Sequence, residues 1–306
     1  MKETLSVAAL ALAMTGSAFA ADLPSYKAPL PPPMWTGFYV GLNAGGTWSN
    51  SNFVRTTSAP IFALDGGAAN TLYAANSALG ASGVSQGNTS GFIGGGQIGY
   101  NWQFYNNFVA GIEADIQGVA SNNSNTTMAT AVGPFPYFGA DEVLVTGITT
   151  SKRLDYIGTV RGRLGWLFTP TLLVYSTGGL AYGGVSLSTG ITQVNNDCVQ
   201  FPADCLAPAA FSSGAFSDTR VGWTAGGGLE WMFWPNWSAK VEYLYYDLGD
   251  VVYSAGVLAT GGNILFPGSI AAAVVSQSST RFNGNIVRAG VNYHFNWGSP
   301  SVVAKY

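Results

Sequence analysis

The segment Arg153-Leu-Asp-Tyr-Ile-Gly-Thr-Val-Arg-Gly-Arg-Leu-Gly-Trp-Leu-Phe168 decides the fold class, because its side chains alternate between two chemical kinds. One set of alternate positions is apolar or glycine: Leu154, Tyr156, Gly158, Val160, Gly162, Leu164, Trp166 and Phe168. The other set is Arg153, Asp155, Ile157, Thr159, Arg161 and Arg163. Neighbouring side chains of a strand point to opposite faces, and a lipid-facing arginine at mid-bilayer costs about 2–4 kcal/mol. The pattern therefore predicts a transmembrane strand with its arginines inside a barrel.

The composition agrees with a membrane barrel rather than with a soluble domain. Only 9% of the 306 residues are charged, against roughly 25% in soluble domains. The mean hydropathy is +0.22, yet the chain after residue 20 has no apolar run long enough for a transmembrane helix. Dispersed hydrophobicity of this kind is typical of lipid-facing strands. The net charge of −3 predicts no nucleic-acid partner.

An internal repeat sets the number of strands. Four segments share the pattern small–x–aliphatic–x–aromatic–x–aromatic and end 66, 65 and 62 residues apart: Gly96–Trp102, Gly162–Phe168, Gly227–Phe233 and Ala289–Phe295. A short turn follows each of the first three. Each unit therefore resembles two strands, one long connection and one short turn.

Period-two alternation places eight strands at 35–49, 89–103, 107–120, 152–168, 171–187, 218–233, 236–249 and 280–296. The long polar segments between them are 50–88, 121–151, 188–217 and 250–279. The predicted fold is all-β, an eight-stranded antiparallel transmembrane β-barrel with four long external loops and short periplasmic turns. The repeated aromatic endings predict a periplasmic girdle: Tyr100, Trp102, Trp166, Phe168, Trp231, Phe233, Tyr293 and Phe295.

The same alternation predicts a cluster of charged side chains inside the barrel: Glu113, Asp115, Arg153, Asp155, Arg161, Arg163, Arg220, Glu230, Lys240, Glu242 and Arg288. Two interpretations compete for this cluster. It lines an aqueous pore, or it forms a paired polar core. Eight strands enclose little more than their own side chains, and six basic against five acidic residues favour pairing. We expect a closed barrel.

The ends of the chain predict export. Residues 1–20 have a basic start, a short apolar stretch and the sequence Ala18-Phe19-Ala20, which together indicate a cleaved signal peptide. Residues 21–34 form a Pro-rich periplasmic leader, residues 35–296 the barrel and residues 297–306 a C-terminal tail. An even number of strands places both termini in the periplasm of a protein of the outer membrane.

The residues with catalytic or ligating chemistry are few. Cys198 and Cys205 lie close in sequence, and export makes a disulfide between them the expected state. The single histidine, His294, lies at the predicted periplasmic end of the last strand, with no nucleophile beside it in the sequence. The sequence therefore predicts neither an enzyme nor a metal site.

Three segments resemble the small outer-membrane barrels of alpha-proteobacteria. They are the opening WTGFYVGLNAGG from Trp35, GFIGGGQIGYNW at 91–102, and the ending VRAGVNYHF at 287–295. The family includes surface antigens and hemin-binding proteins, and its barrel is similar to the OmpA transmembrane domain. The resemblance spans residues 35–296. In the family the last strand usually ends the chain on an aromatic residue, whereas here eleven residues follow Phe295. Either this tail folds back without obstructing barrel assembly, or its terminal Tyr306 contributes to recognition by the assembly machinery.

The resemblance implies three roles: a structural and surface-presenting protein, a narrow porin for small solutes, or a hemin-binding receptor. Hemin binding requires an axial ligand or an apolar slot in the external loops. The predicted loops contain no histidine and offer only weak candidate ligands: Met128, Tyr73, Tyr137 and Tyr253. We expect the structural role, with no cofactor. Expected partners are outer-membrane lipid and lipopolysaccharide, together with the barrel-assembly machinery.

Overall fold

The computed structural model describes residues 34–105, 107–121, 124–135, 142–196, 209–261 and 270–295. Its elements are β1 (Gly37–Ser49), β2 (Phe53–Ala63), η1 (Leu64–Gly66), α1 (Ala68–Gly80), β3 (Gly83–Gln86), β4 (Gly91–Phe104), β5 (Phe108–Ser121), β6 (Ser124–Phe135), β7 (Glu142–Thr169), β8 (Leu172–Asn195), β9 (Ala209–Trp234), β10 (Trp237–Ser254), β11 (Leu258–Gly261) and β12 (Ile270–Phe295). The signal peptide, the Pro-rich leader up to residue 33, both cysteines and the C-terminal tail lie outside these residues.

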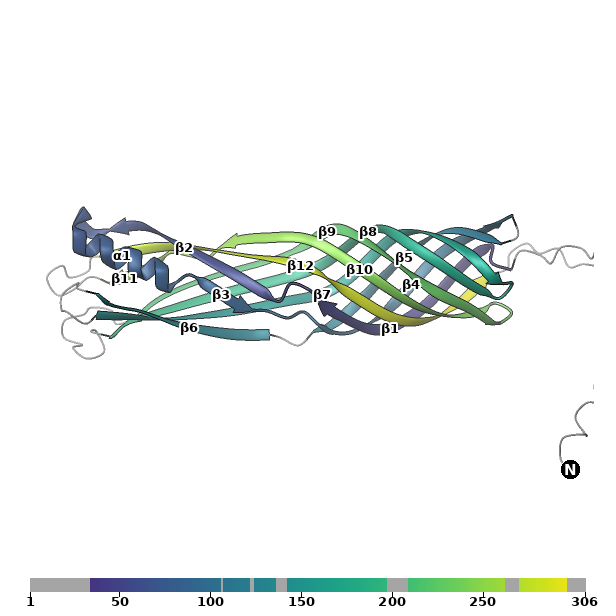
Figure 1. The fold of residues 1–306 in the computed structure, drawn as a ribbon, viewed down its shortest axis with the longest axis horizontal. Helices are drawn as coiled ribbons and strands as arrows, with labels where there is room; N and C mark the ends of the chain where they lie inside the picture. Colours follow the sequence, from purple (N-terminus) through teal and green to yellow (C-terminus); the bar gives the residue numbers. More distant parts are fainter. Residues whose placement is uncertain are drawn as a thin grey trace, which may run out of the picture. The chain divides into compact units, whose positions relative to one another are not determined.

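Eight strands form a closed antiparallel ring in the order β1–β4–β5–β7–β8–β9–β10–β12 (Figure 1). The ring closes where β12 pairs with β1, from Phe38 opposite Phe295 to Ser49 opposite Gly284. A closed ring leaves no unpaired strand edge within the bilayer, where an unpaired backbone group costs several kcal/mol. The predicted eight-stranded barrel is confirmed.

The outward face of β1 shows how much of the ring is apolar. Alternate residues from Phe38 to Trp48 point outward, and Leu42 between them is 74% exposed. Ten residues of a strand tilted by about 40° rise roughly 25 Å, which is the height of the apolar band of such barrels. Within the described residues, no helix is long and apolar enough to cross a membrane.

Strands continue into all four segments that were predicted as long loops. β7, β8, β9 and β12 run on past the apolar band, while β6 pairs with β7, β2 pairs with β12 and β11 pairs with β12. The sheet therefore extends beyond the band at the end opposite the short turns (Figure 1). Ser, Thr and Gly in these segments gave little alternation in hydrophobicity, so the sequence pattern did not reveal these strands.

Helix α1 packs against this extension. Its residues include five alanines, which favour a helix. Tyr73, Ala74, Ser77 and Ala78 share one buried face. Ala78 packs into an apolar cluster with residues of β7, β8, β9 and β12, and Ser77 Oγ donates a hydrogen bond to Gln193 Oε1 at 2.5 Å. The extension thus has its own core.

A β-bulge at Asp155 divides β7 into two parts that differ in which alternate side chains point into the barrel. The pairing of β7 with β8 shifts between Leu154 and Tyr156. One extra residue in a strand reverses which side chains point inward. Residues with odd numbers face inward below the bulge, as Ile157 does, whereas Leu154 and Lys152 face inward above it. The continuous alternation assumed from the sequence therefore ends at this bulge.

We predict that single cysteines at positions 153 and 154 will differ in reactivity. Arg153→Cys places a thiol on the outer surface and should react with a membrane-impermeant maleimide on intact cells. Leu154→Cys places the thiol in the fully buried interior and should stay unlabelled until the protein is denatured. Labelling is read by mass shift in a background without the two native cysteines. The reverse pattern would contradict the bulge.

Candidate functional site

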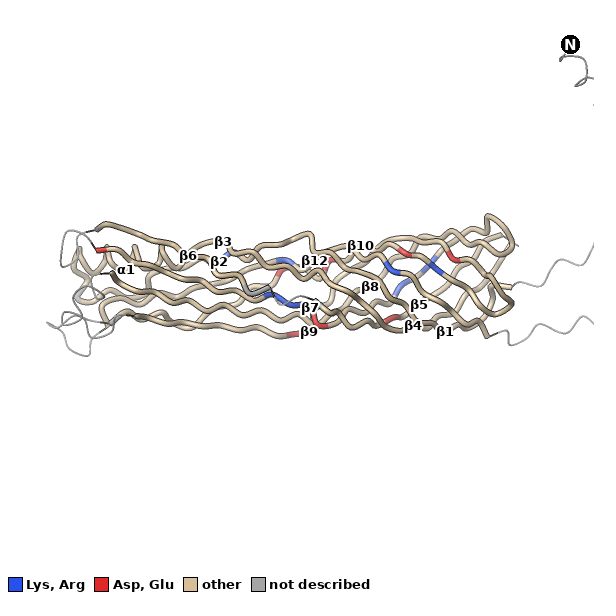
Figure 2. Tube along the Cα trace, turned by 90° about the horizontal axis from the view of Figure 1, so that it is seen from below, with Lys and Arg blue, Asp and Glu red and all other residues tan. Residues whose placement is uncertain are grey.

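Eight of the eleven predicted interior charges lie inside the ring. Each is at most 5% exposed: Glu113, Asp115, Arg161, Arg163, Glu230, Lys240, Glu242 and Arg288. We call these residues the charge cluster. They come from β5, β7, β9, β10 and β12, and the four basic groups balance the four acidic groups. Figure 2 shows charged residues along the strands in the part of the barrel near the short turns.

Arg161 is the centre of the charge cluster. Its guanidinium donates hydrogen bonds to Glu113 at 2.5 Å and Asp115 at 2.9 Å, both on β5, and to Glu242 of β10 at 2.9 Å. Lys240 binds the same Glu113 carboxylate at 2.8 Å. A buried charge is tolerated only when opposite charges and hydrogen bonds compensate for its lost hydration. Arg161 meets that condition by joining strands from two sides of the ring.

Two further arginines complete the pairing. The Arg288 guanidinium lies 2.8 Å from Asp115 and 2.6 Å from Glu242. Arg163 lies 2.6 Å from Glu230. Since a guanidinium presents five donors in a rigid fork, it can bridge carboxylates on different strands. The charge cluster is consequently a network of cross-strand bridges rather than a row of free charges.

Two tyrosines bind the carboxylates, and two glycines make room for them. Tyr39 donates to Glu113 at 2.6 Å and Tyr175 donates to Glu242 at 3.1 Å. A Cβ on Gly99 would lie 2.4 Å from the Tyr39 ring, and one on Gly228 would lie 2.8 Å from the Tyr175 hydroxyl. The sequence pattern did not place these tyrosines inside the barrel, because an aromatic residue in a barrel strand is usually expected on the lipid side.

Three predicted interior charges lie elsewhere, and the prediction is corrected for them. Arg153 and Asp155 form an exposed ion pair at 2.8 Å, with side chains 43% and 41% exposed. The bulge in β7 turns both outward. Arg220 lies above the point where β9 stops pairing with β10, and its guanidinium donates to the Asp250 carbonyl oxygen at 2.8 Å. Arg220 is therefore partly exposed rather than buried with the charge cluster.

Lys152 is a buried cation that the sequence assignment had missed. The bulge brings it inside, above the charge cluster, where its ammonium donates to the carbonyl oxygens of Ser51 at 2.7 Å and Arg281 at 2.8 Å. The ring of Phe282 lies 4.6 Å from the nitrogen. Two carbonyl dipoles and an aromatic face thus take the place of a carboxylate.

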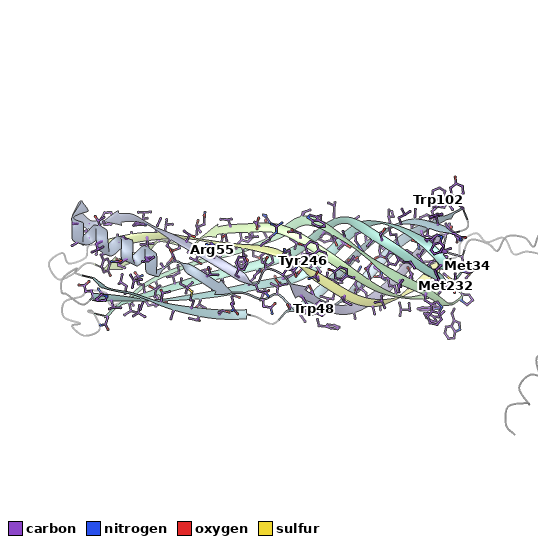
Figure 3. The ribbon with its side chains drawn as sticks, viewed as in Figure 1. Met34, Trp48, Arg55, Trp102, Met232 and Tyr246 are labelled. Atoms are coloured by element: carbon purple, nitrogen blue, oxygen red, sulfur yellow. The ribbon has the colours of Figure 1, made fainter. Side chains whose placement is uncertain are left out.

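Apolar layers lie above and below the charge cluster. The layer toward the extension contains Val54, Ile93, Leu154, Ile157, Ala181, Val185, Leu187, Leu244, Tyr246, Leu248, Val251, Tyr253, Phe282 and Ile286, all buried. Toward the short turns, Trp35 is 1% exposed and packs with Val109, Leu167 and Met232. Figure 3 shows Tyr246 from the first layer, and Met34 and Met232 near the short turns. The described side chains therefore fill the interior on both sides of the charges.

The predicted girdle residues lie on the outer surface at the end with the short turns. Trp102 is 59% exposed, Phe168 65% and Trp231 56%. Two neighbouring pairs contact each other edge to face: Trp166 with Phe168, and Tyr293 with Phe295. Figure 3 shows Trp102 at this end and Trp48 at the opposite limit of the apolar band. Aromatic residues at both levels are typical of the two interfaces of a membrane barrel.

His294 lies beside a serine and a carboxylate in an arrangement unlike that of a hydrolase. His294 Nε2 lies 2.8 Å from Ser238 Oγ and 3.4 Å from Glu230, and the serine donates to Glu230 at 2.6 Å. A triad instead places the carboxylate on the other imidazole nitrogen, where it orients the base. All three residues are buried beneath Trp35, whose ring contacts His294. A substrate has no access to this serine in the described structure.

The hemin candidates that the structure describes are buried or engaged. Tyr73 is 5% exposed, and Tyr253 is 7% exposed with its hydroxyl bonded to Thr189. Met128 packs against an inner apolar cluster. Tyr137 lies outside the described residues. None of the three described side chains presents a ligand on the outer surface.

Replacement of Arg161 tests the pairing inside the barrel. We expect Arg161→Met to lower the free energy of unfolding by about 3–5 kcal/mol, because it leaves buried carboxylates uncompensated. Arg153→Met, on the same strand but in an exposed pair, is the matched control and should cost about 1 kcal/mol or less. Urea unfolding in lipid vesicles, followed by tryptophan fluorescence, measures both. Equal losses would mean that Arg161 is not a central bridge.

Comparison with known proteins finds similarity to outer-membrane barrel proteins. The family model described as outer membrane protein beta-barrel domain matches residues 6–295. The 31 kDa outer-membrane immunogenic protein of Brucella melitensis biotype 1 is 32% identical over 300 residues, covering 96% of this chain and all of that protein. The 22 kDa outer membrane protein of Rhizobium leguminosarum bv. viciae is 26% identical over 240 residues, covering 75% and 76% of the two chains.

Among solved structures, Neisserial surface protein A is 12% identical with a TM-score of 0.31, covering 85% of this chain and 98% of that one. The outer membrane protein OprG from Pseudomonas aeruginosa is 10% identical with a TM-score of 0.36, covering 85% and 97%. The match to the family model over residues 6–295, together with the match to the Brucella protein over 96% of this chain, identifies this chain as a member of the outer membrane protein β-barrel family, located in the outer membrane.

Proposed function

We propose that this protein is a closed, non-enzymatic barrel with a structural and surface-presenting role in the outer membrane. The observation that carries the proposal is the interior of the ring, where four basic and four acidic side chains pair between two apolar layers. A channel needs a continuous polar path. Here the buried apolar layer that contains Val54, Leu154 and Ile286 interrupts the polar interior, and an eight-stranded ring is only just wide enough for its own side chains.

The extension supports the surface-presenting part of the proposal. It carries β-structure and α1 with an apolar core of its own, so it holds a fixed surface beyond the membrane. Two relatives, the 31 kDa protein of Brucella melitensis and the 25 kDa protein of Brucella abortus, are named outer-membrane immunogenic proteins. The outward apolar band is the surface that contacts outer-membrane lipid, and the girdle aromatics match the interfacial level.

The porin interpretation predicts current, and the closed barrel predicts none. Purified protein with intact heat-modifiable migration should give no reproducible stepwise conductance in planar bilayers. A mock preparation from membranes without the protein controls for contaminating porins. Stepwise currents that increase in Phe282→Ala, which thins the apolar layer, would arise from this barrel and would overturn the proposal.

The hemin interpretation is tested separately. Because the described candidate ligands are buried or bonded, titration with hemin should produce no saturable shift of the Soret band. The titration is compared with detergent micelles alone, which take up hemin without saturation. A saturable shift that disappears in Tyr73→Phe or Met128→Leu would favour the receptor function instead.

A further inference from the structure

We propose that the outer face of β6–β9 beyond the membrane is the contact surface for a second copy of this chain. Alternate residues of these four strands point outward there and lie in register across the sheet. Four rows run from β6 to β9: Ala131, Val145, Val194 and Ala209; Ala129, Gly147, Thr192 and Phe211; Thr127, Thr149, Gly190 and Ser213; and, from β7 onward, Ser151, Ser188 and Ala215. We call these residues the neutral face.

The neutral face carries no charge and is partly apolar. Phe211 is 69% exposed and Val145 is 45% exposed, although both lie in a part of the sheet that is far from the apolar band. The nearest charges on the outer surface of these strands are Arg153 and Asp155, at its lower margin. Figure 2 shows few charged residues among the described part of this end of the sheet. A face of this composition meets an identical face without like-charge repulsion.

The size of the neutral face suits a weak to moderate dimer. Four strands about 4.8 Å apart and four rows about 6.7 Å apart cover roughly 500 Å² on each copy, or about 1,000 Å² in total. A hollow of about 500 Å³, lined by Thr149, Ser151, Ser188, Gly190 and Ser213 among others, lies within it. The small side chains thus leave space for the projecting groups of a facing surface.

Insertion in a common membrane favours a second copy of this chain over other partners. All copies cross the bilayer in the same direction and at the same depth, so their neutral faces lie at one height. A two-fold axis along the membrane normal then brings the face of one copy onto the same face of another, which is the isologous contact of most dimers. Association within a membrane also costs less rotational and translational freedom than association in solution.

Disulfide cross-linking tests the proposal in native outer membranes. In a background with Cys198→Ser and Cys205→Ser, Thr149→Cys lies near the middle of the neutral face and should form a disulfide dimer on oxidation. Gln277→Cys is the matched control. Gln277 is exposed on β12. It lies at the same height as Thr149, because its neighbour Ser278 meets Thr189 of β8 across the interior at 3.2 Å. The control should remain monomeric.

Charge insertion gives an independent measurement. Thr149→Lys places like charges opposite each other in the proposed dimer, so two differently tagged copies should no longer co-purify, whereas Gln277→Lys should leave co-purification unchanged. Three results would overturn the proposal: maleimide-reactive Thr149→Cys without a dimer, equal cross-linking at Gln277→Cys, or a disulfide formed only with a different protein.

Discussion

The pairing of β12 with β1 is the constraint on which the rest of the structure depends. Within a bilayer, a sheet edge has no water to satisfy its backbone groups, so the first and last ring strands must meet. Their register, from Phe38 opposite Phe295 to Ser49 opposite Gly284, closes the ring at eight strands. Closure then divides the side chains of every strand into an inward-facing set and an outward-facing set. It also limits the interior to about the volume of its own side chains.

That small interior explains why the charges are balanced. Arg161 and Arg288 could not remain buried without carboxylates within hydrogen-bond distance, because the loss of hydration would exceed any gain from packing. The carboxylates of Glu113 and Glu242 also accept hydrogen bonds from Tyr39 and Tyr175. A ring this narrow therefore favours a paired network over an open pore, and the apolar layers above and below it continue the same packing.

The bulge at Asp155 has a comparable role in the extension. It turns Leu154 inward and Arg153 outward at the level where the barrel leaves the apolar band. The charged pairs lie below this level, an apolar layer that includes Leu154 and Ile157 lies at it, and α1 packs against the core of the extension above. Because β7 continues through both parts, the extension is held in register with the ring rather than attached by a flexible connection.

The sequence by itself determined the number of strands in the ring and which of their side chains face inward or outward. In residues 157–168, arginines alternate with apolar and aromatic residues, and burial of a charge in lipid is costly, so the inward and outward faces of this strand are determined. The four repeated aromatic endings determine the number of strands and the position of the girdle. Tertiary structure alone decided the rest. The bulge that moves Arg153 and Asp155 outward is a matter of strand pairing, which alternation cannot reveal. The strands within the predicted loops arise from pairing with β7 and β12, because their Ser, Thr and Gly residues have little preference of their own.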